Sequence, residues 1–186
     1  MHRQHLKDLL RRYAKEWPAE AAMAARFAAF AAAHDDCLLR TCAPGHITAS
    51  AWILSPDGER ALLTHHRKLG RWLQLGGHVD GEPHVARAAL REAQEESGMA
   101  EFGLPAGDRE PIDLDIHPIP AHGREPAHLH YDVRFVLVAG AGQQLRVSDE
   151  SHALRWFPVA ELESVLEEES VLRLARKATR WLARPR

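Results

Sequence analysis

The spacing of hydrophobic residues in the first 34 residues differs from that in the rest of the chain. In residues 6–17 (LKDLLRRYAKEW) apolar side chains recur at helical intervals, and alanine, the best helix former, dominates residues 19–33. Pro18 separates these segments, so we expect two helices within the first 34 residues. Phe27 and Phe30 lie three positions apart on one face of the second predicted helix, which indicates packing into a core.

After residue 46 the spacing shortens to that of strands. ITASAWILS (47–55) and ALLTHH (61–66) flank a turn-rich segment, which predicts a hairpin. Further strands are expected at residues 71–77, 112–119, 130–140 and 154–157. Helices are expected at about residues 83–97, directly after Pro158, and at residues 170–182. Strands interleaved with helices, with a hairpin among them, indicate an α/β fold with a mixed sheet.

Composition narrows the class of protein. The 186 residues, 45% hydrophobic and 27% charged, are typical of a folded globular chain. A formal net charge of −2 gives no reason to expect nucleic acid as a partner, and no apolar run approaches the ~18 residues of a membrane span. The first residues are too charged for a secretory signal, and Cys37 and Cys42 lack the spacing of metal or redox motifs. We therefore expect a cytoplasmic protein with reduced thiols and without nucleic-acid or membrane partners; a homodimer is left open.

Three glutamates gather on the helix expected at residues 83–97, which Gly98 would end. At ~100° per residue, Glu92, Glu95 and Glu96 fall within an arc of about 100° beside the apolar stripe, so the carboxylates are expected to converge. Like charges at this spacing repel, and carboxylates in the last turn face the negative end of the helix dipole. Arg91, four positions before Glu95, gives partial relief. A hard divalent cation would relieve the rest, whereas a solvated acidic face is the alternative.

With its flanks, this segment resembles the signature of the Nudix family, G-x₅-E-x₇-R-E-U-x-E-E-x-G-U, in which U is a bulky aliphatic residue. The positions that match at the same offsets are Gly77, Arg91, Glu92, Glu95, Glu96 and Gly98, and Met99 closes the box. The resemblance implies a Nudix-like α/β/α sandwich with a mixed sheet, to which extra N-terminal helices are added. We expect residues 1–44 to form a helical extension packed on the core, and residues 45–186 to form the Nudix domain with its C-terminal helices.

The resemblance also implies a reaction. Nudix enzymes hydrolyse a nucleoside diphosphate linked to another moiety with Mg²⁺ or Mn²⁺, which activates water for attack on phosphorus. Glu95 and Glu96 match the principal metal-binding positions, and Glu92 matches a glutamate that joins them or helps to deprotonate the water. Arg91 would orient a glutamate. Two alternatives share the fold: a non-catalytic nucleotide-binding regulator and an enzyme similar to isopentenyl diphosphate isomerase.

The sequence departs from the family pattern at one of the fixed positions, and Ala93 is a small stand-in for an aliphatic residue. Pro83 occupies the place of the first box glutamate, while the interval from Gly77 to Arg91 keeps its full length. In the family this glutamate largely braces the loop and the helix, often through the box arginine. Glu82 or Asp80 could supply the brace from a neighbouring position, and Pro83 suits the first position of a helix.

Other side chains are candidates for binding substrate. Gly76, Gly77 and His78 lie in the loop expected to face phosphate, and Gln74 and Arg67 precede it. A further candidate lies between two predicted strands in VSDES, where Glu150 could act as a general base outside the box.

Thirteen histidines raise the question of a second metal site. His128 and His130 alternate at a strand start and could point the same way, with His117 and His122 nearby in sequence. Spacing alone fixes no third ligand, so histidines that line a pocket or the surface remain the alternative.

Overall fold

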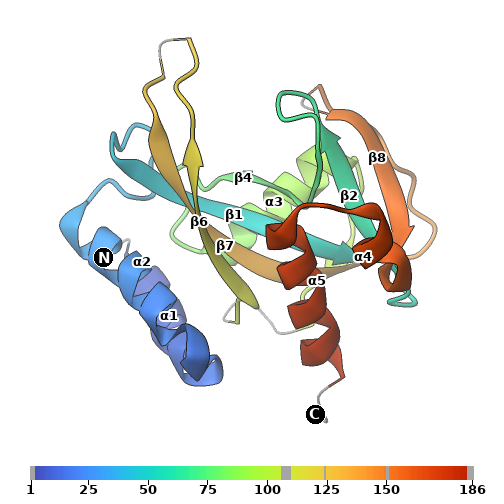
Figure 1. Ribbon diagram of the computed structural model, residues 1–186, viewed down its shortest axis with the longest axis horizontal. Coiled ribbons are helices and arrows are strands. Elements are labelled where there is room, and N and C mark those ends of the chain that lie inside the picture. Colours follow the sequence, from blue (N-terminus) through green and yellow to red (C-terminus); the bar gives the residue numbers. More distant parts are fainter. Residues whose placement is uncertain (1–2, 106–109, 124, 150, 184–186) are drawn as a thin grey trace.

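The computed structural model describes residues 3–105, 110–123, 125–149 and 151–183. A mixed sheet forms its centre, with helix α3 behind the sheet and helix α5 in front of it in the view of Figure 1. The strands are β1 (Gly45–Leu54), β2 (Arg60–His66), β3 (Trp72–Leu73), β4 (Leu75–His78), β5 (Phe102–Gly103), β6 (Asp113–Ile119), β7 (His128–Ala139) and β8 (Ser151–Pro158). The helices are α1 (Gln4–Glu16), α2 (Ala21–Ala33), α3 (Val85–Ser97), α4 (Leu162–Val165) and α5 (Glu169–Leu182), with single 3₁₀ turns at Pro18–Glu20 and Val159–Glu161.

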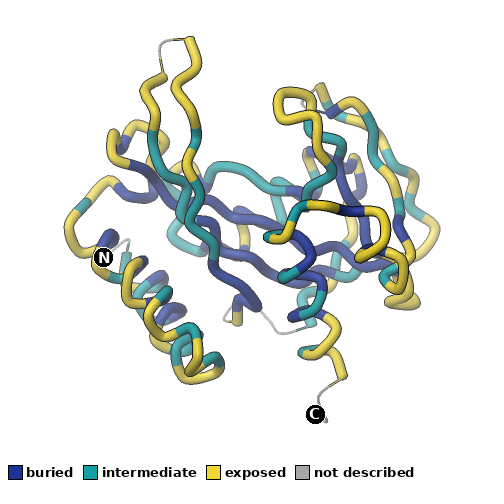
Figure 2. Tube along the Cα trace, viewed as in Figure 1, coloured by how far each residue is buried: buried dark blue, intermediate teal, exposed yellow. Residues whose placement is uncertain are grey.

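Strands β1 and β7 form the centre of the sheet. They run parallel over the whole length of β1, and the other strand pairs are antiparallel. The order is β3-β2-β1-β7-β5, while β4 also pairs with β1, β6 with β7 and β8 with β2. Every residue of β1 is buried, as expected for a strand covered on both faces, and Figure 2 shows this buried centre.

Alternate residues of β1 and β7 face different cores. Ile47, Ala49 and Val133 pack with α1, α2 and α3, whereas Trp52 and Val136 pack with α4 and α5. This arrangement confirms the predicted α/β class, the three-layer sandwich and the added N-terminal helices. The β1–β2 hairpin and the buried face of α2 at Phe27 and Phe30 are confirmed as well.

Several boundaries differ from those that the sequence predicts. The segment 71–77 forms two short strands, β3 and β4, with Gln74 between them, and β5 was not predicted. Helix α3 begins at Val85 with His84 as its N-cap, so Pro83 precedes the helix and is not its first residue. Gly98 does end α3, as predicted, in the left-handed conformation with φ 72°.

The N-terminal helices share the core of the sheet. Leu6, Leu9 and Phe27 belong to the same hydrophobic cluster as Ile47 and Val133. Cys37 and Cys42 are buried and not joined in a disulfide. Among the described residues, no helix is long and apolar enough to cross a membrane.

Candidate active site

The end of β4 and the body of α3 meet through polar contacts at the residues of the box. The backbone N–H of Gly76 donates to Oε2 of Glu96 over 2.9 Å, and Nη2 of Arg91 donates to the carbonyl of His78 over 2.6 Å. Gly77 lies against Glu92 so closely that a Cβ at this position would be 2.6 Å from a carboxylate oxygen. The box glycine therefore leaves the space that the glutamate occupies.

Arg91 holds two of the three glutamates. Its guanidinium lies 2.9 Å from the carboxylate of Glu92 and 3.1 Å from that of Glu95. The contact with Glu95 confirms the relief expected four positions along the helix. Since Arg91 also binds the His78 carbonyl, one side chain fixes both the helix carboxylates and the loop.

The three carboxylates differ in their surroundings. The side chains of Glu92 and Glu95 are 14% and 59% exposed, and Glu96 is buried. Within the described part of the chain, they do not each bring an oxygen to within 4.8 Å of the other two. The expected convergence is therefore partial: Glu92 and Glu96 turn toward β4, whereas Glu95 follows Arg91 toward solvent, which separates like charges.

In the loop between β4 and α3, Glu82 makes a contact other than the brace to Arg91 that the sequence suggested. Oε1 of Glu82 accepts the backbone N–H of His84 over 2.8 Å, which satisfies a donor at the start of α3. Asp80 adopts a positive φ of 47° in the preceding turn, and the N–H of Gly81 donates to the carbonyl of Leu38. The contacts of Arg91 in the described chain are with Glu92, Glu95 and His78, so neither Glu82 nor Asp80 braces it here.

A polar face of the sheet lies beside this junction and was not predicted from the sequence. Asp132 on β7 accepts hydrogen bonds from Ser50 at 2.9 Å and Thr48 at 3.1 Å, both on β1. Nε2 of Gln74 lies 3.5 Å from the same carboxylate, and Oε1 of Gln74 is buried without a partner in the described residues. Gln74 thus faces the polar side of the sheet, and its role in binding substrate stays a prediction.

Arg134 is the centre of the buried charges on this face. Its guanidinium contacts Asp132 at 2.8 Å and both Asp113 and Asp115 at 3.1 Å. Burial alone would lower the pKa of Arg134, but these three carboxylates raise it, so the guanidinium stays charged. Burial would likewise raise the pKa of Asp115, but the hydrogen bond from His117 and the charges of Arg134 and Arg173 hold that pKa well below its usual range.

The remaining predicted residues are dispersed. Arg67 donates to the carbonyl of Ser151 over 3.1 Å and so ties the end of β2 to β8. Nε2 of His128 lies 3.3 Å from Nε2 of His130, so these rings point the same way as predicted, whereas His122 pairs with Glu125 in an isolated bridge. Glu150 lies outside the described residues.

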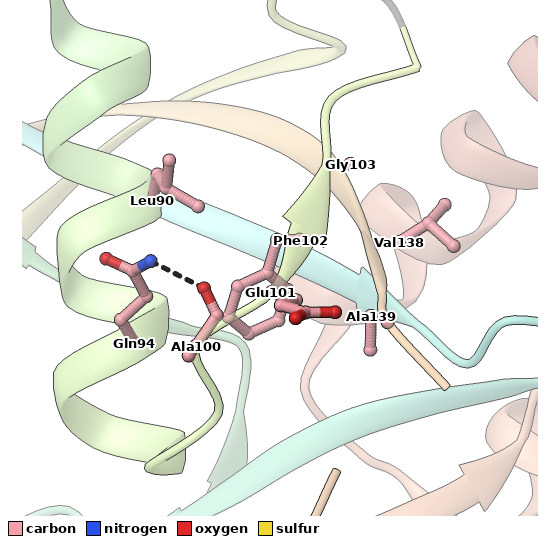
Figure 3. A pocket seen from close by; sticks show the side chains of 9 residues that line it. Leu90, Gln94, Ala100, Glu101, Phe102, Gly103, Val138 and Ala139 are labelled. Carbon is pink, nitrogen blue, oxygen red and sulfur yellow. Dashed lines mark hydrogen bonds between the residues drawn. The ribbon is translucent and has the colours of Figure 1, made fainter. Parts of the chain in front are cut away.

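The structure also has a hollow that lies away from the predicted site residues, so cavity size does not identify the candidate active site. The hollow of 540 Å³ lies between α3, β5 and β7, and Leu90, Gln94, Phe102 and Val138 are among its lining residues (Figure 3). None of the predicted site residues lines it. The polar junction of β4 and α3 remains the candidate active site because the chemically active side chains meet there.

Comparisons with known proteins agree with this geometry. The model of the NUDIX domain matches residues 44–182, which include β1, α3 and α5. No curated protein matches the chain.

Solved structures share the fold. A hydrolase of the Nudix family from Clostridium perfringens is 24% identical, with 74% of this chain and 97% of that chain covered and a TM-score of 0.57. The Ap4A hydrolase of C. elegans, in a binary complex, is 18% identical over 74% of this chain and 97% of its own, with a TM-score of 0.58. The MutT protein of Methanosarcina mazei is 18% identical over 76% and 97% of the two chains, with a TM-score of 0.55.

Proposed function

The chain belongs to the Nudix hydrolase family, and from that premise we propose that it hydrolyses the diphosphate linkage of a nucleoside diphosphate joined to another moiety. Water attacks phosphorus in this reaction, with Mg²⁺ or Mn²⁺ as the cofactor. The similar structures include an Ap4A hydrolase and a MutT protein, and we propose a substrate of this broad phosphoanhydride class for this chain.

The contact between β4 and α3 carries the proposal. Arg91 joins the His78 carbonyl to Glu92 and Glu95, and the N–H of Gly76 fixes Glu96. A helix that served only as a solvated acidic surface would need none of these contacts with the loop. The box residues therefore act as one unit although Pro83 has replaced its first glutamate.

The residues fit a hard divalent cation. Carboxylate oxygens are the ligands that Mg²⁺ and Mn²⁺ prefer, and Glu92, Glu95 and Glu96 offer only such oxygens. Because Gly77 has no Cβ, the carboxylate of Glu92 can lie against the loop, where a Cβ would be 2.6 Å from one of its oxygens. When bound, the cation would neutralise charge that develops on the phosphoryl oxygens and lower the pKa of the attacking water.

The chain supplies orientation around that cation. Arg91 holds Glu92 and Glu95, and its contact with the His78 carbonyl keeps the loop in register with the helix. Gln74 offers an amide oxygen without a partner toward the polar face, where it could accept a hydrogen bond from substrate. Residues Gly76, Gly77 and His78 would place the diphosphate beside the glutamates, and we retain Glu150 as a candidate base and Arg67 as a candidate phosphate contact.

A substrate panel tests the proposal. The purified chain would be offered ADP-ribose, NADH, dinucleoside polyphosphates, nucleoside triphosphates, coenzyme A and sugar nucleotides, each with Mg²⁺ or Mn²⁺, and the phosphorus products would be measured. We expect turnover of at least one compound that EDTA abolishes. Tight binding of one ligand without turnover of any would contradict the proposal and support the regulator.

A further inference from the structure

A cluster of histidines lies on the polar face of the sheet and takes no part in the proposed hydrolysis apart from His78. His46, His78 and His130 come from β1, β4 and β7. One ring nitrogen from each lies within 4.8 Å of the others. Three adjacent strands thus bring together nitrogen ligands that are far apart in the sequence.

Register explains why these rings meet. His46 and His130 are direct partners in the parallel pairing of β1 and β7, so their side chains leave the sheet on the same face. Their ring centroids are 4.7 Å apart, and the ring of His78 lies 4.9 Å from that of His46. The three rings therefore surround a common point above the sheet.

His46 is the decisive member of this cluster. It is 3% exposed, and both of its ring nitrogens are buried without a hydrogen-bond partner among the described residues. A buried polar group without a partner destabilises the fold, and a ligand that accepts the lone pair of the imidazole would offset this cost. A metal ion is such an acceptor for one of the two ring nitrogens.

Two neighbouring histidines support the same arrangement. Nδ1 of His128 lies 2.9 Å from the carbonyl of Pro126, so this nitrogen must donate and the neutral ring keeps its lone pair on Nε2. That Nε2 lies 3.3 Å from His130. Nδ1 of His117 likewise donates to the carboxylate of Asp115 over 3.1 Å, the type of contact that orients histidines at metal sites.

We propose that His46, His78 and His130 form a binding site for a transition metal ion of the Zn²⁺ class, separate from the carboxylate site on α3. Imidazole nitrogens select Zn²⁺, Co²⁺ or Ni²⁺ over Mg²⁺, which prefers oxygen. Nitrogens that bind Zn²⁺ at ~2.0–2.1 Å lie roughly 3.4 Å apart, so small rotations of these rings would complete the site. His128 supplies a further nitrogen beside it.

The two sites share strand β4. The ring of His78 belongs to the histidine cluster, whereas its carbonyl accepts the hydrogen bond from Arg91. A metal ion bound to this ring would therefore also hold the loop that positions the box glutamates. The histidine site itself does not depend on whether the chain hydrolyses diphosphates.

Binding of Co²⁺ to the full chain tests the site. Protein without a histidine tag would be stripped with EDTA, freed of the chelator and titrated with Co²⁺ while the visible absorption is recorded. We expect one equivalent to give the strong absorption of a nitrogen-rich site of low coordination number, and Zn²⁺ to displace it. Weak absorption of an octahedral oxygen site, or no stoichiometric binding, would overturn the proposal.

Matched variants locate the ion. His46→Gln and His130→Gln should each weaken Co²⁺ binding at least ~10-fold, the smallest loss typical of a metal site that loses even a supporting residue. The variant His152→Gln, which alters an exposed histidine on β8, should bind Co²⁺ as the unaltered chain does. Unchanged binding in both His46→Gln and His130→Gln would contradict the site, provided that circular dichroism shows folded protein.

A measurement on the unaltered chain tests the site without variants, which could misfold. Side-chain ¹⁵N resonances of histidine report directly on the nitrogen that binds a metal. Addition of Zn²⁺ should shift the resonances of His46, His78 and His130 and leave those of His65 and His152 in place. Shifts confined to other histidines would overturn the proposal.

Discussion

Arg134 shows how single residues on the sheet face depend on one another. The guanidinium is 1% exposed and contacts Asp113, Asp115 and Asp132. Burial of charge is tolerated here because each charged group has a partner and the guanidinium also donates to Ser170. Removal of one member would leave the others uncompensated.

Replacement of Arg134 tests this dependence. Arg134→Met should lower the free energy of unfolding by about 3–5 kcal/mol, because it leaves buried carboxylates short of a cation. Arg155→Met is the matched control, since Arg155 is exposed and lies over the ring of Phe157, and it should cost about 1 kcal/mol or less. Urea unfolding followed by circular dichroism measures both, and equal losses would contradict a special role for Arg134.

Glu82 gives a second prediction at the scale of a residue. Glu82→Ala should destabilise the chain by about 1 kcal/mol, because the N–H of His84 loses its acceptor at the start of α3. Glu82→Gln keeps an acceptor oxygen and should be nearly neutral. Neither variant should change kcat, since Glu82 does not contact Arg91 in the described chain. A fall in kcat of tenfold or more in Glu82→Gln would show that it braces Arg91 after all.

The polar face of the sheet matches no known motif, but the sequence carries a signal for it. His46, Thr48 and Ser50 alternate on β1, and His128, His130, Asp132 and Arg134 alternate on β7. A period of two places each set on one face of a strand, so the polar side could be predicted strand by strand. That β1 and β7 are parallel neighbours, with His46 opposite His130, could not be predicted, because register depends on the pairing of distant segments.

At the scale of an element, the end of α3 is fixed by Gly98. Its φ of 72° is one that glycine adopts readily, and a Cβ there would lie 2.5 Å from Cβ of Arg146. Gly142 has a similar φ of 74° but nothing within 4 Å of an added Cβ. A comparison of substitutions at the two glycines therefore separates the cost of backbone strain from the cost of steric overlap.

This difference predicts the outcome of two substitutions. Gly142→Ala should cost about 1–2 kcal/mol of stability, the penalty of a left-handed conformation. Gly98→Ala should cost about 1–3 kcal/mol more, because it adds overlap with Arg146 in a packed region. Thermal unfolding of the two variants measures this difference in stability. Equal melting temperatures would contradict the prediction, because they would mean that Arg146 can move away from the added Cβ without loss of stability.

The start of α3 shows why some boundaries escape prediction. Pro83 suits the first helical position by its fixed φ, and this local property placed the expected start. In the structure His84 is the N-cap, because the carboxylate of Glu82 accepts its N–H and the preceding turn is tied to Leu38 through Gly81. Leu38 is remote in sequence, so local propensity cannot reveal this contact.

At the scale of the whole molecule, a buried lysine joins distant parts of the chain. Nζ of Lys177 on α5 lies 2.8 Å from Glu20, 2.7 Å from the hydroxyl of Tyr13 on α1 and 3.0 Å from Asp113 on β6. Amphipathic spacing predicted α5 itself but not this contact, since the contact joins segments that are distant in the sequence. The division into an extension at residues 1–44 and a domain at residues 45–186 remains a proposal, and we expect the two to unfold together.

Labelling of Cys37 tests that expectation. The thiol is buried in the core that α1 and α2 share with the sheet, and burial raises its pKa. A thiol reagent at pH 8 should therefore react only after the chain opens, with an opening free energy equal to that of global unfolding by urea. Labelling at least ~100-fold faster than global opening permits would mean that the extension unfolds by itself.

The rate of hydrolysis after loss of one box carboxylate tests the central claim most directly. With the best substrate of the panel and saturating Mg²⁺ or Mn²⁺, kcat would be compared between the unaltered chain, Glu95→Gln, Glu96→Gln and Glu59→Gln, whose glutamate is exposed in the β1–β2 turn. We predict that Glu95→Gln and Glu96→Gln each lower kcat at least ~10²-fold, since charge is lost where the transition state needs it, while Glu59→Gln has no effect. Unchanged kcat in both Glu95→Gln and Glu96→Gln would contradict the proposed site.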